Sequence, residues 1–163
     1  MKQSVITMLS RFKPKKIVIV SSCPQIRYPD CYGIDMSKIG DFITFQACIE
    51  LLKETGRESL IQEVYEKSKS ELEKPKILIR NIVKELYDLF TEDEISKKIS
   101  QMVKGDINCE VEVVYQTIDG LRKSLPSRYG DWYFSGDYPT SGGMMVVNKS
   151  FINYFEGKNL RSY

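Results

Sequence analysis

The sequence contains no histidine. Histidine is the usual general base near neutral pH, and both the Ser-His-Asp and the Cys-His nucleophile arrangements depend on it. Its absence therefore argues against a self-contained hydrolase. Because the sequence also lacks clusters of metal-ligating residues and an activated nucleophile, an independent enzyme of other chemistry is the least favoured hypothesis.

Cysteine is sparse. The four cysteines lie far apart, at Cys23, Cys31, Cys48 and Cys109, and no two of them form a C-x-x-C pair. This spacing suggests neither a zinc site nor a disulfide framework. We expect buried free thiols.

Net charge is small and long apolar runs are missing. The 24 basic and 22 acidic residues leave a formal charge of +2, and the two signs are interspersed, which argues against a nucleic-acid partner. No apolar run approaches the roughly 20 residues of a membrane span, and residues 1–4 do not resemble the start of a signal peptide. The sequence predicts a cytoplasmic protein that does not span a membrane.

The apolar residues that are present suffice for one folded core, since 42% of the chain is hydrophobic. A β-branched run at 17–22 predicts a strand covered on both faces, preceded by a short helix over 5–12. A second strand is predicted at 111–115, and an amphipathic helix over 37–56. These elements indicate an α/β sheet, and the long connection 23–36 falls at the carboxyl edge, where such sheets bind ligands.

Residues 57–104 have a helical pattern instead. Apolar periodicity predicts one helix over 60–72 and another over 75–90, with a proline in its first turn. Thr91 and Glu94 form a capping box that opens a third helix. Acidic and basic residues are almost balanced and interspersed along this segment, as on solvated helix faces, so we predict a helical insertion or subdomain.

A short helix over 117–124 is expected next. Its apolar residues should point inward: Ile118, Leu121 and Leu125. The aromatic, turn-rich stretch 130–140 includes Trp132, which we interpret as a surface anchor. We interpret Gly142-Gly143 as a flexible turn rather than a phosphate cradle, followed by a last short helix near 151–155.

Two segments resemble one enzyme family. The segment Ile26-Arg27-Tyr28-Pro29-Asp30-Cys31-Tyr32-Gly33-Ile34-Asp35-Met36, with Ser21-Ser22-Cys23-Pro24-Gln25 before it, resembles the stretch that follows the final core strand of the transferase domain of amidophosphoribosyltransferases. Near the end, Tyr133-Phe134-Ser135-Gly136-Asp137-Tyr138-Pro139-Thr140 resembles the terminal motif of that family. The resemblance covers residues 1–56 and 106–145 and leaves the helical middle unmatched.

The resemblance implies a fold and an activity. Members of the family are glutamine amidotransferases and glycosyltransferases of purine biosynthesis, which transfer ammonia from glutamine onto phosphoribosyl pyrophosphate to make phosphoribosylamine. It implies an α/β fold with a partial phosphoribosyltransferase-type parallel sheet. Residues 1–56 would be the C-terminal part of the core, 57–104 a helical insertion, and 105–163 the return to the core and the tail.

The family's catalytic motifs do not occur in this sequence. The family holds the ribose 5-phosphate with a strand that ends in paired acids and a small-residue loop, and its glutaminase nucleophile is an N-terminal cysteine. We therefore predict a truncated, inactive C-terminal fragment without catalytic residues. Phosphoribosyl pyrophosphate with magnesium, glutamine and purine nucleotides are expected as ligands of the whole enzyme only.

The candidate site residues lie in and just after the first motif. By the resemblance, Tyr32, Asp35, Met36 and Ser37 fall in the region where purine nucleotides inhibit the family. Asp35 either accepts hydrogen bonds from a nucleotide or caps the helix that starts near Ser37, a position that is often proline in the family. Phe42 matches an apolar position that lines the ammonia channel, and packing in the core is the alternative explanation for it.

The same segment contains an arginine of open role and the positions that match cluster ligands in the family. Arg27 either positions a ligand or an adjoining subunit, or it is simply solvated. Some members of the family bind an iron-sulfur cluster through cysteines. Here Asp30 falls where the first of those ligands would be and Cys31 one position later, so we predict no cluster and no metal ligands.

A non-catalytic module is the alternative hypothesis. It would be either a nucleotide-binding regulatory domain or a protein-interaction domain built around residues 57–104. A truncated sheet would leave apolar surface uncovered, and we therefore predict that the isolated chain forms a homo-oligomer or exchanges segments.

Overall fold

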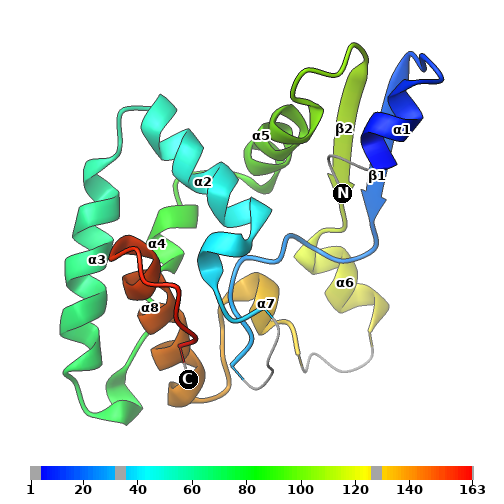
Figure 1. Cartoon of the computed structure of the whole chain (residues 1–163). Coiled ribbons are helices and arrows are strands. Elements are labelled where there is room, and N and C mark those ends of the chain that lie inside the picture. The colour runs from blue at the N-terminus through cyan, green and yellow to red at the C-terminus, as the bar shows by residue number, and fades with distance from the viewer. Residues whose placement is uncertain (1–4, 32–35, 126–129, 163) are drawn as a thin grey trace.

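The computed structural model describes residues 5–31, 36–125 and 130–162, which form helices and a parallel two-stranded sheet that lies at one side of the molecule (Figure 1). Strand β1 (Lys16–Ser21) pairs with β2 (Glu110–Tyr115) in a register that sets Ile17 beside Val111. The expected mixture of helices with a parallel sheet is confirmed. No helix in these ranges is both long enough and apolar enough to cross a membrane.

Among the described residues, only one face of the sheet is covered, so the expectation of a strand buried on both faces is wrong. On the inner face, Ile6, just before α1 (Thr7–Ser10), packs with Ile17 and Val111. On the outer face, the side chains of Val18 and Val20 are 50% and 73% exposed. In most parallel sheets a strand rich in β-branched residues is buried on both faces, whereas here the described helices cover only one face of the sheet.

Four longer helices build the core: α2 (Ile43–Glu54), α3 (Ser59–Leu72), α5 (Glu92–Lys104) and α8 (Ser141–Phe155). Helix α5 packs against both β2 and α2, and α3 lies along α8 (Figure 1). One buried cluster joins Phe45 of α2, Ile99 of α5 and Phe151 of α8. The segment between α2 and β2 therefore shares the core of the segments that flank it.

The capping box is confirmed. The side-chain oxygen of Thr91 accepts a hydrogen bond from the backbone N–H of Glu94 at 3.2 Å, and the carboxylate of Glu94 accepts one from the N–H of Thr91 at 2.8 Å. Helix α5 begins there and ends at Gly105, whose φ of 50° favours glycine.

The predicted helix over 75–90 is wrong. In its place are a short 3₁₀ turn, η3 (Lys76–Leu78), an extended stretch, and a short helix, α4 (Lys84–Tyr87). The side-chain amide of Asn148 on α8 donates to the carbonyl of Arg80 at 2.7 Å and accepts from the N–H of Ile82 at 3.1 Å. These backbone groups bond to a distant side chain, so the helical pattern cannot pass through them.

The glycine pair is not a flexible turn, because Gly142 and Gly143 form the first turn of α8. The hydroxyl of Thr140 accepts a hydrogen bond from the N–H of Gly143 at 3.3 Å and caps the helix. A Cβ atom on Gly143 would stand 2.4 Å from the ring of Tyr138. Glycine is needed here because the tyrosine ring lies against the helix backbone.

Two short helices precede this point, α6 (Ile118–Ser124) and α7 (Trp132–Ser135). Ile118 and Leu121 are half-buried, but Leu125 is exposed, so its predicted inward orientation is wrong. Trp132 is half-buried and packs against the core, in keeping with an anchor for this stretch.

Candidate functional site

Residues 26–31 of the first segment that resembles the enzyme family lie against the second segment, 133–140. The carbonyl of Tyr133 accepts hydrogen bonds from the backbone N–H groups of Arg27 at 2.9 Å and Tyr28 at 3.1 Å. The hydroxyl of Tyr133 also donates to the carboxylate of Asp30 at 3.2 Å. The loop after β1 is thus fixed by a segment about a hundred residues later in the chain.

Tyrosine rings fill the space between these segments. The hydroxyl of Tyr138 donates to the carbonyl of Pro29. The ring of Tyr28 is buried beneath Gly136, which adopts a φ of 75°. Burial raises the pKa values of both tyrosine hydroxyls above their ordinary range, so both remain protonated donors at physiological pH.

A cavity of about 220 Å³ lies at the carboxyl edge of the sheet. The last residues of the two strands, Ser21 and Tyr115, line it, together with Ile26, Met36 and Phe42. This is the edge at which open α/β sheets bind ligands, as the sequence suggested. The walls are largely apolar, which suits a flat or neutral ligand better than a bare anion.

A larger cavity of about 750 Å³ adjoins it beneath the inner face of the sheet, between α2 and α5. The two cavities share Ser21, Ile43 and Tyr115 as lining residues. Lys98, one of its lining residues, forms ion pairs with Glu54 and Glu50, and these carboxylates raise its pKa. The positive charge is thus neutralised, and the interior of the larger cavity offers mainly apolar contacts.

The structure brings two of the predicted site residues together and separates a third. Met36 and Phe42 line the smaller cavity. Phe42 also packs against the core, as the alternative explanation expects, and its place in an ammonia channel stays a prediction. Tyr32 and Asp35 lie outside the described residues.

Ser37 does not line the smaller cavity, and the expectation of a helix that starts near Ser37 is wrong. A 3₁₀ turn, η2 (Ile39–Asp41), comes first, and α2 begins only at Ile43. The cause is Ser150 on α8, whose hydroxyl accepts from the N–H of Ile39 at 3.0 Å and contacts the carbonyl of Ser37 at 3.2 Å. Ser37 is consequently buried away from the site.

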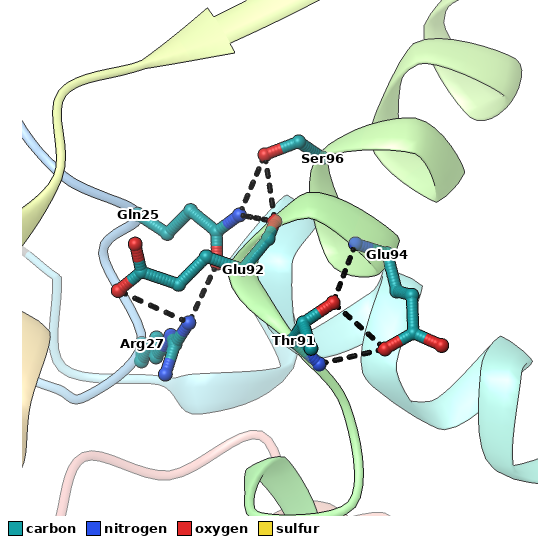
Figure 2. Close-up of polar contacts among 6 residues, drawn as sticks. All are labelled: Gln25, Arg27, Thr91, Glu92, Glu94 and Ser96. Carbon is teal, nitrogen blue, oxygen red and sulfur yellow. Dashed lines mark hydrogen bonds and ion pairs between the residues drawn. The ribbon is translucent and has the colours of Figure 1, made fainter.

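Arg27 is not solvated but belongs to a polar cluster at the start of α5 (Figure 2). Its guanidinium donates to the side-chain oxygen of Gln25 at 2.9 Å and lies 3.8 Å from the carboxylate of Glu92. The amide nitrogen of Gln25 in turn donates to the carbonyl of Glu92 at 2.7 Å and the hydroxyl of Ser96 at 2.8 Å. Figure 2 shows how these contacts tie the loop after β1 to the first turn of α5.

Sequence reasoning missed Tyr87, which lies beneath the same arginine. The guanidinium carbon of Arg27 stands 5.4 Å from the centre of the Tyr87 ring, within cation–π range. Tyr87 sat inside a predicted helix among apolar residues, and nothing in that pattern distinguishes it from ordinary core. Its polar hydroxyl within a buried stripe was the only available signal.

Cys48 and Cys109 are buried free thiols as expected, whereas Cys23 and Cys31 are half-buried. Within the described ranges, no three His, Cys, Asp or Glu side chains gather as a metal site. No protein-family model, no curated protein and no solved structure matches this chain. Interpretation of its function therefore rests on the contacts above and on the residues that make them.

Proposed function

We propose that the chain is the C-terminal part of the phosphoribosyltransferase domain of an amidophosphoribosyltransferase, the glycosyltransferase that makes phosphoribosylamine from phosphoribosyl pyrophosphate and glutamine-derived ammonia. The contact between the two motif segments carries the proposal. Both segments resemble the same family, and the carbonyl of Tyr133 in one accepts hydrogen bonds from the N–H groups of Arg27 and Tyr28 in the other. Segments of one functional site are expected to meet in this way at the carboxyl edge of the sheet.

The sheet itself supports a partial domain. The N–H of Gln116 donates to the carbonyl of Ser21, so Ser21 turns its backbone groups toward β2. In a parallel pair every second residue of a strand does so, and the N–H groups of Val18 and Val20 therefore point away from β2. Within the described part of the chain, the N–H groups of Val18 and Val20 have no hydrogen-bond acceptor at this edge of β1. At the opposite edge, on β2, the N–H of Val113 donates to the hydroxyl of Ser100 on α5 at 2.9 Å.

An open edge and an uncovered outer face occur together on β1. Parallel sheets are normally covered on both faces, and two strands alone are marginally stable. Further strands beside β1 and further helices over Val18 and Val20 would complete a phosphoribosyltransferase-type sheet.

In this proposal the described residues bind and shield but do not catalyse. The carboxyl-edge cavity is the candidate site for an inhibiting purine nucleotide, with Met36 on its wall. Phe42 and the apolar cavity beyond it would keep water away from ammonia in transit. Phosphoribosyl pyrophosphate, its magnesium and glutamine would be bound by the remainder of the enzyme.

The native polypeptide provides the test. An antibody raised against this chain would be used to isolate the protein from the cells that make it, and its intact mass would be measured. We expect a mass well above 18.9 kDa, with glutamine-dependent release of pyrophosphate from phosphoribosyl pyrophosphate in the isolate. A native mass of 18.9 kDa without that activity overturns the proposal.

A protein-interaction module is the second candidate, favoured by one observation. Ile77 and Leu78 in the helical segment are 84% and 58% exposed, and adjacent large apolar side chains on a surface often mark a contact site. A partner that protects residues 57–104 from proteolysis would support this candidate, whereas nucleotide binding without turnover would support a regulatory module.

A further inference from the structure

The stretch 79–87 reaches both motif segments from within the helical part of the chain. It contains an extended turn and helix α4, and we refer to it as the clamp. Tyr87 contacts the first motif segment, and Asn81 contacts the second. The clamp thus joins the two segments through two different side chains.

Tyr87 holds the first segment through three kinds of contact. Its hydroxyl donates to the carbonyl of Arg27 at 3.0 Å, and its ring lies beneath the guanidinium of the same residue. The ring of Tyr28 meets it edge-on, with centroids 5.5 Å apart. Because Tyr133 binds the N–H of Arg27 from the other segment, the backbone of Arg27 is held on both its N–H and its C=O.

Asn81 holds the second segment. Its side-chain amide donates to the carbonyl of Gly136 at 3.1 Å. A Cβ atom on Gly136 would stand 2.7 Å from that amide nitrogen, so the fit is close. Lys84 adds an ion pair with Asp137 at 2.7 Å, which is solvent-exposed and therefore a minor contribution.

The clamp is itself fixed to the core. Asn148 of α8 binds the backbone on both sides of Asn81, and the carboxylate of Glu71 on α3 accepts from the N–H of Arg80 at 2.8 Å. The thiol of Cys48 on α2 donates to the carbonyl of Leu86 at 3.2 Å. A clamp anchored on three long helices transmits their positions to the motif segments.

We infer that the clamp positions the loop that forms the wall of the carboxyl-edge cavity, and that Tyr87 is the positioning residue. The role of the helical segment is then to hold the loop at Arg27 and Tyr28, so that Ile26 and Met36 face the cavity. The inference concerns the loop alone and needs no ligand. Its effect on nucleotide affinity rests on the proposed function.

Hydrogen exchange of the isolated chain tests the inference. Tyr87→Phe removes one hydroxyl and leaves the ring, and Tyr65→Phe is the matched control, because Tyr65 on α3 donates to Glu156 far from the loop. We expect Tyr87→Phe to speed exchange on the order of fivefold in peptides covering 26–31 and 132–138, the effect of one lost hydrogen bond. Helices α3 and α5 should exchange at unchanged rates, and the control should leave both peptides unchanged.

A second variant keeps the test decisive. Asn81→Asp replaces the amide donor that faces the Gly136 carbonyl with an acceptor, and it should loosen 132–138 first. Equal acceleration throughout the protein, or none in the two peptides, overturns the inference, because Tyr87 would then be ordinary core. If exchange is faster in the two peptides but the protein binds no purine nucleotide, the inference about the clamp stands and the proposed function is contradicted.

Discussion

Gly136 lies against the ring of Tyr28 so closely that a Cβ atom on the glycine would stand 2.8 Å from two ring carbons. The glycine also adopts a φ of 75°, which other residues rarely take. Both requirements arise where the two motif segments meet, so this glycine is needed for backbone conformation and for space at once.

Gly136→Ala should therefore destabilise the fold by about 3 kcal/mol, from left-handed strain together with overpacking. Gly56→Ala is the control, since Gly56 has a φ of 68° but nothing within 4 Å of a Cβ atom. It should cost only about 1 kcal/mol. Urea unfolding of both variants gives the comparison, and equal losses would show that the contact with Tyr28 contributes nothing.

Purine nucleotide binding should depend on Met36 and not on Ser37. Met36 lines the carboxyl-edge cavity, whereas Ser37 is buried and does not line it. Met36→Ala should weaken the binding of a purine mononucleotide by roughly tenfold, corresponding to the loss of about 1.4 kcal/mol of contact. Isothermal titration calorimetry measures this, and an equal effect of Ser37→Ala would move the site away from the cavity.

Stability should fall in alkaline solution. Burial raises the pKa of Cys48 to about 12 and raises those of Tyr28, Tyr87 and Tyr138 above their ordinary range. The unfolded chain releases these protons at ordinary values, about 8.5 for Cys and 10 for Tyr. The stabilisation is thus complete below about pH 8.5 and is lost as the pH rises toward the folded values.

Thermal unfolding followed by circular dichroism between pH 8 and pH 11 measures this loss. The midpoint should decline across that range, and it should decline less steeply in Tyr87→Phe, which lacks one of the titrating groups. A midpoint independent of pH would show that these hydroxyls and the thiol are not desolvated.

Self-association of the isolated chain should proceed through β1. Val20 is 73% exposed on the outer face, and the edge beside it is open to another strand. Val20→Lys should shift sedimentation toward the monomer, because a charge on an edge strand opposes pairing. Ile77→Lys, at a site 84% exposed elsewhere, is the control, and a wild-type chain that is monomeric at all concentrations would contradict the expectation.

The sequence predicts well what neighbouring residues determine. The capping box of Thr91 and Glu94 needs only four residues, and the structure contains it. Both strands also lie within a residue of their predicted limits. Met36 and Phe42 meet at one cavity because both follow a strand whose carboxyl end the sequence located.

The errors have remote causes. The helix over 75–90 is interrupted by Asn148, and the start of α2 is displaced by Ser150, both on the last helix. Each side chain competes for backbone groups more than sixty residues away, which no local pattern reports. The prediction that both faces of β1 are buried is wrong for a different reason. Composition shows that a strand is suited to burial, but it does not show which elements cover the strand.

These two side chains of α8 also impose an order of events. Ser150 completes the backbone hydrogen bonding of a segment 111 residues earlier, and Asn148 does so for one 66 residues earlier. During synthesis, these hydrogen bonds cannot form until α8 has left the ribosome. The entrance to α2 and the clamp are consequently among the last parts of the molecule to acquire their final shape, although they are made long before it.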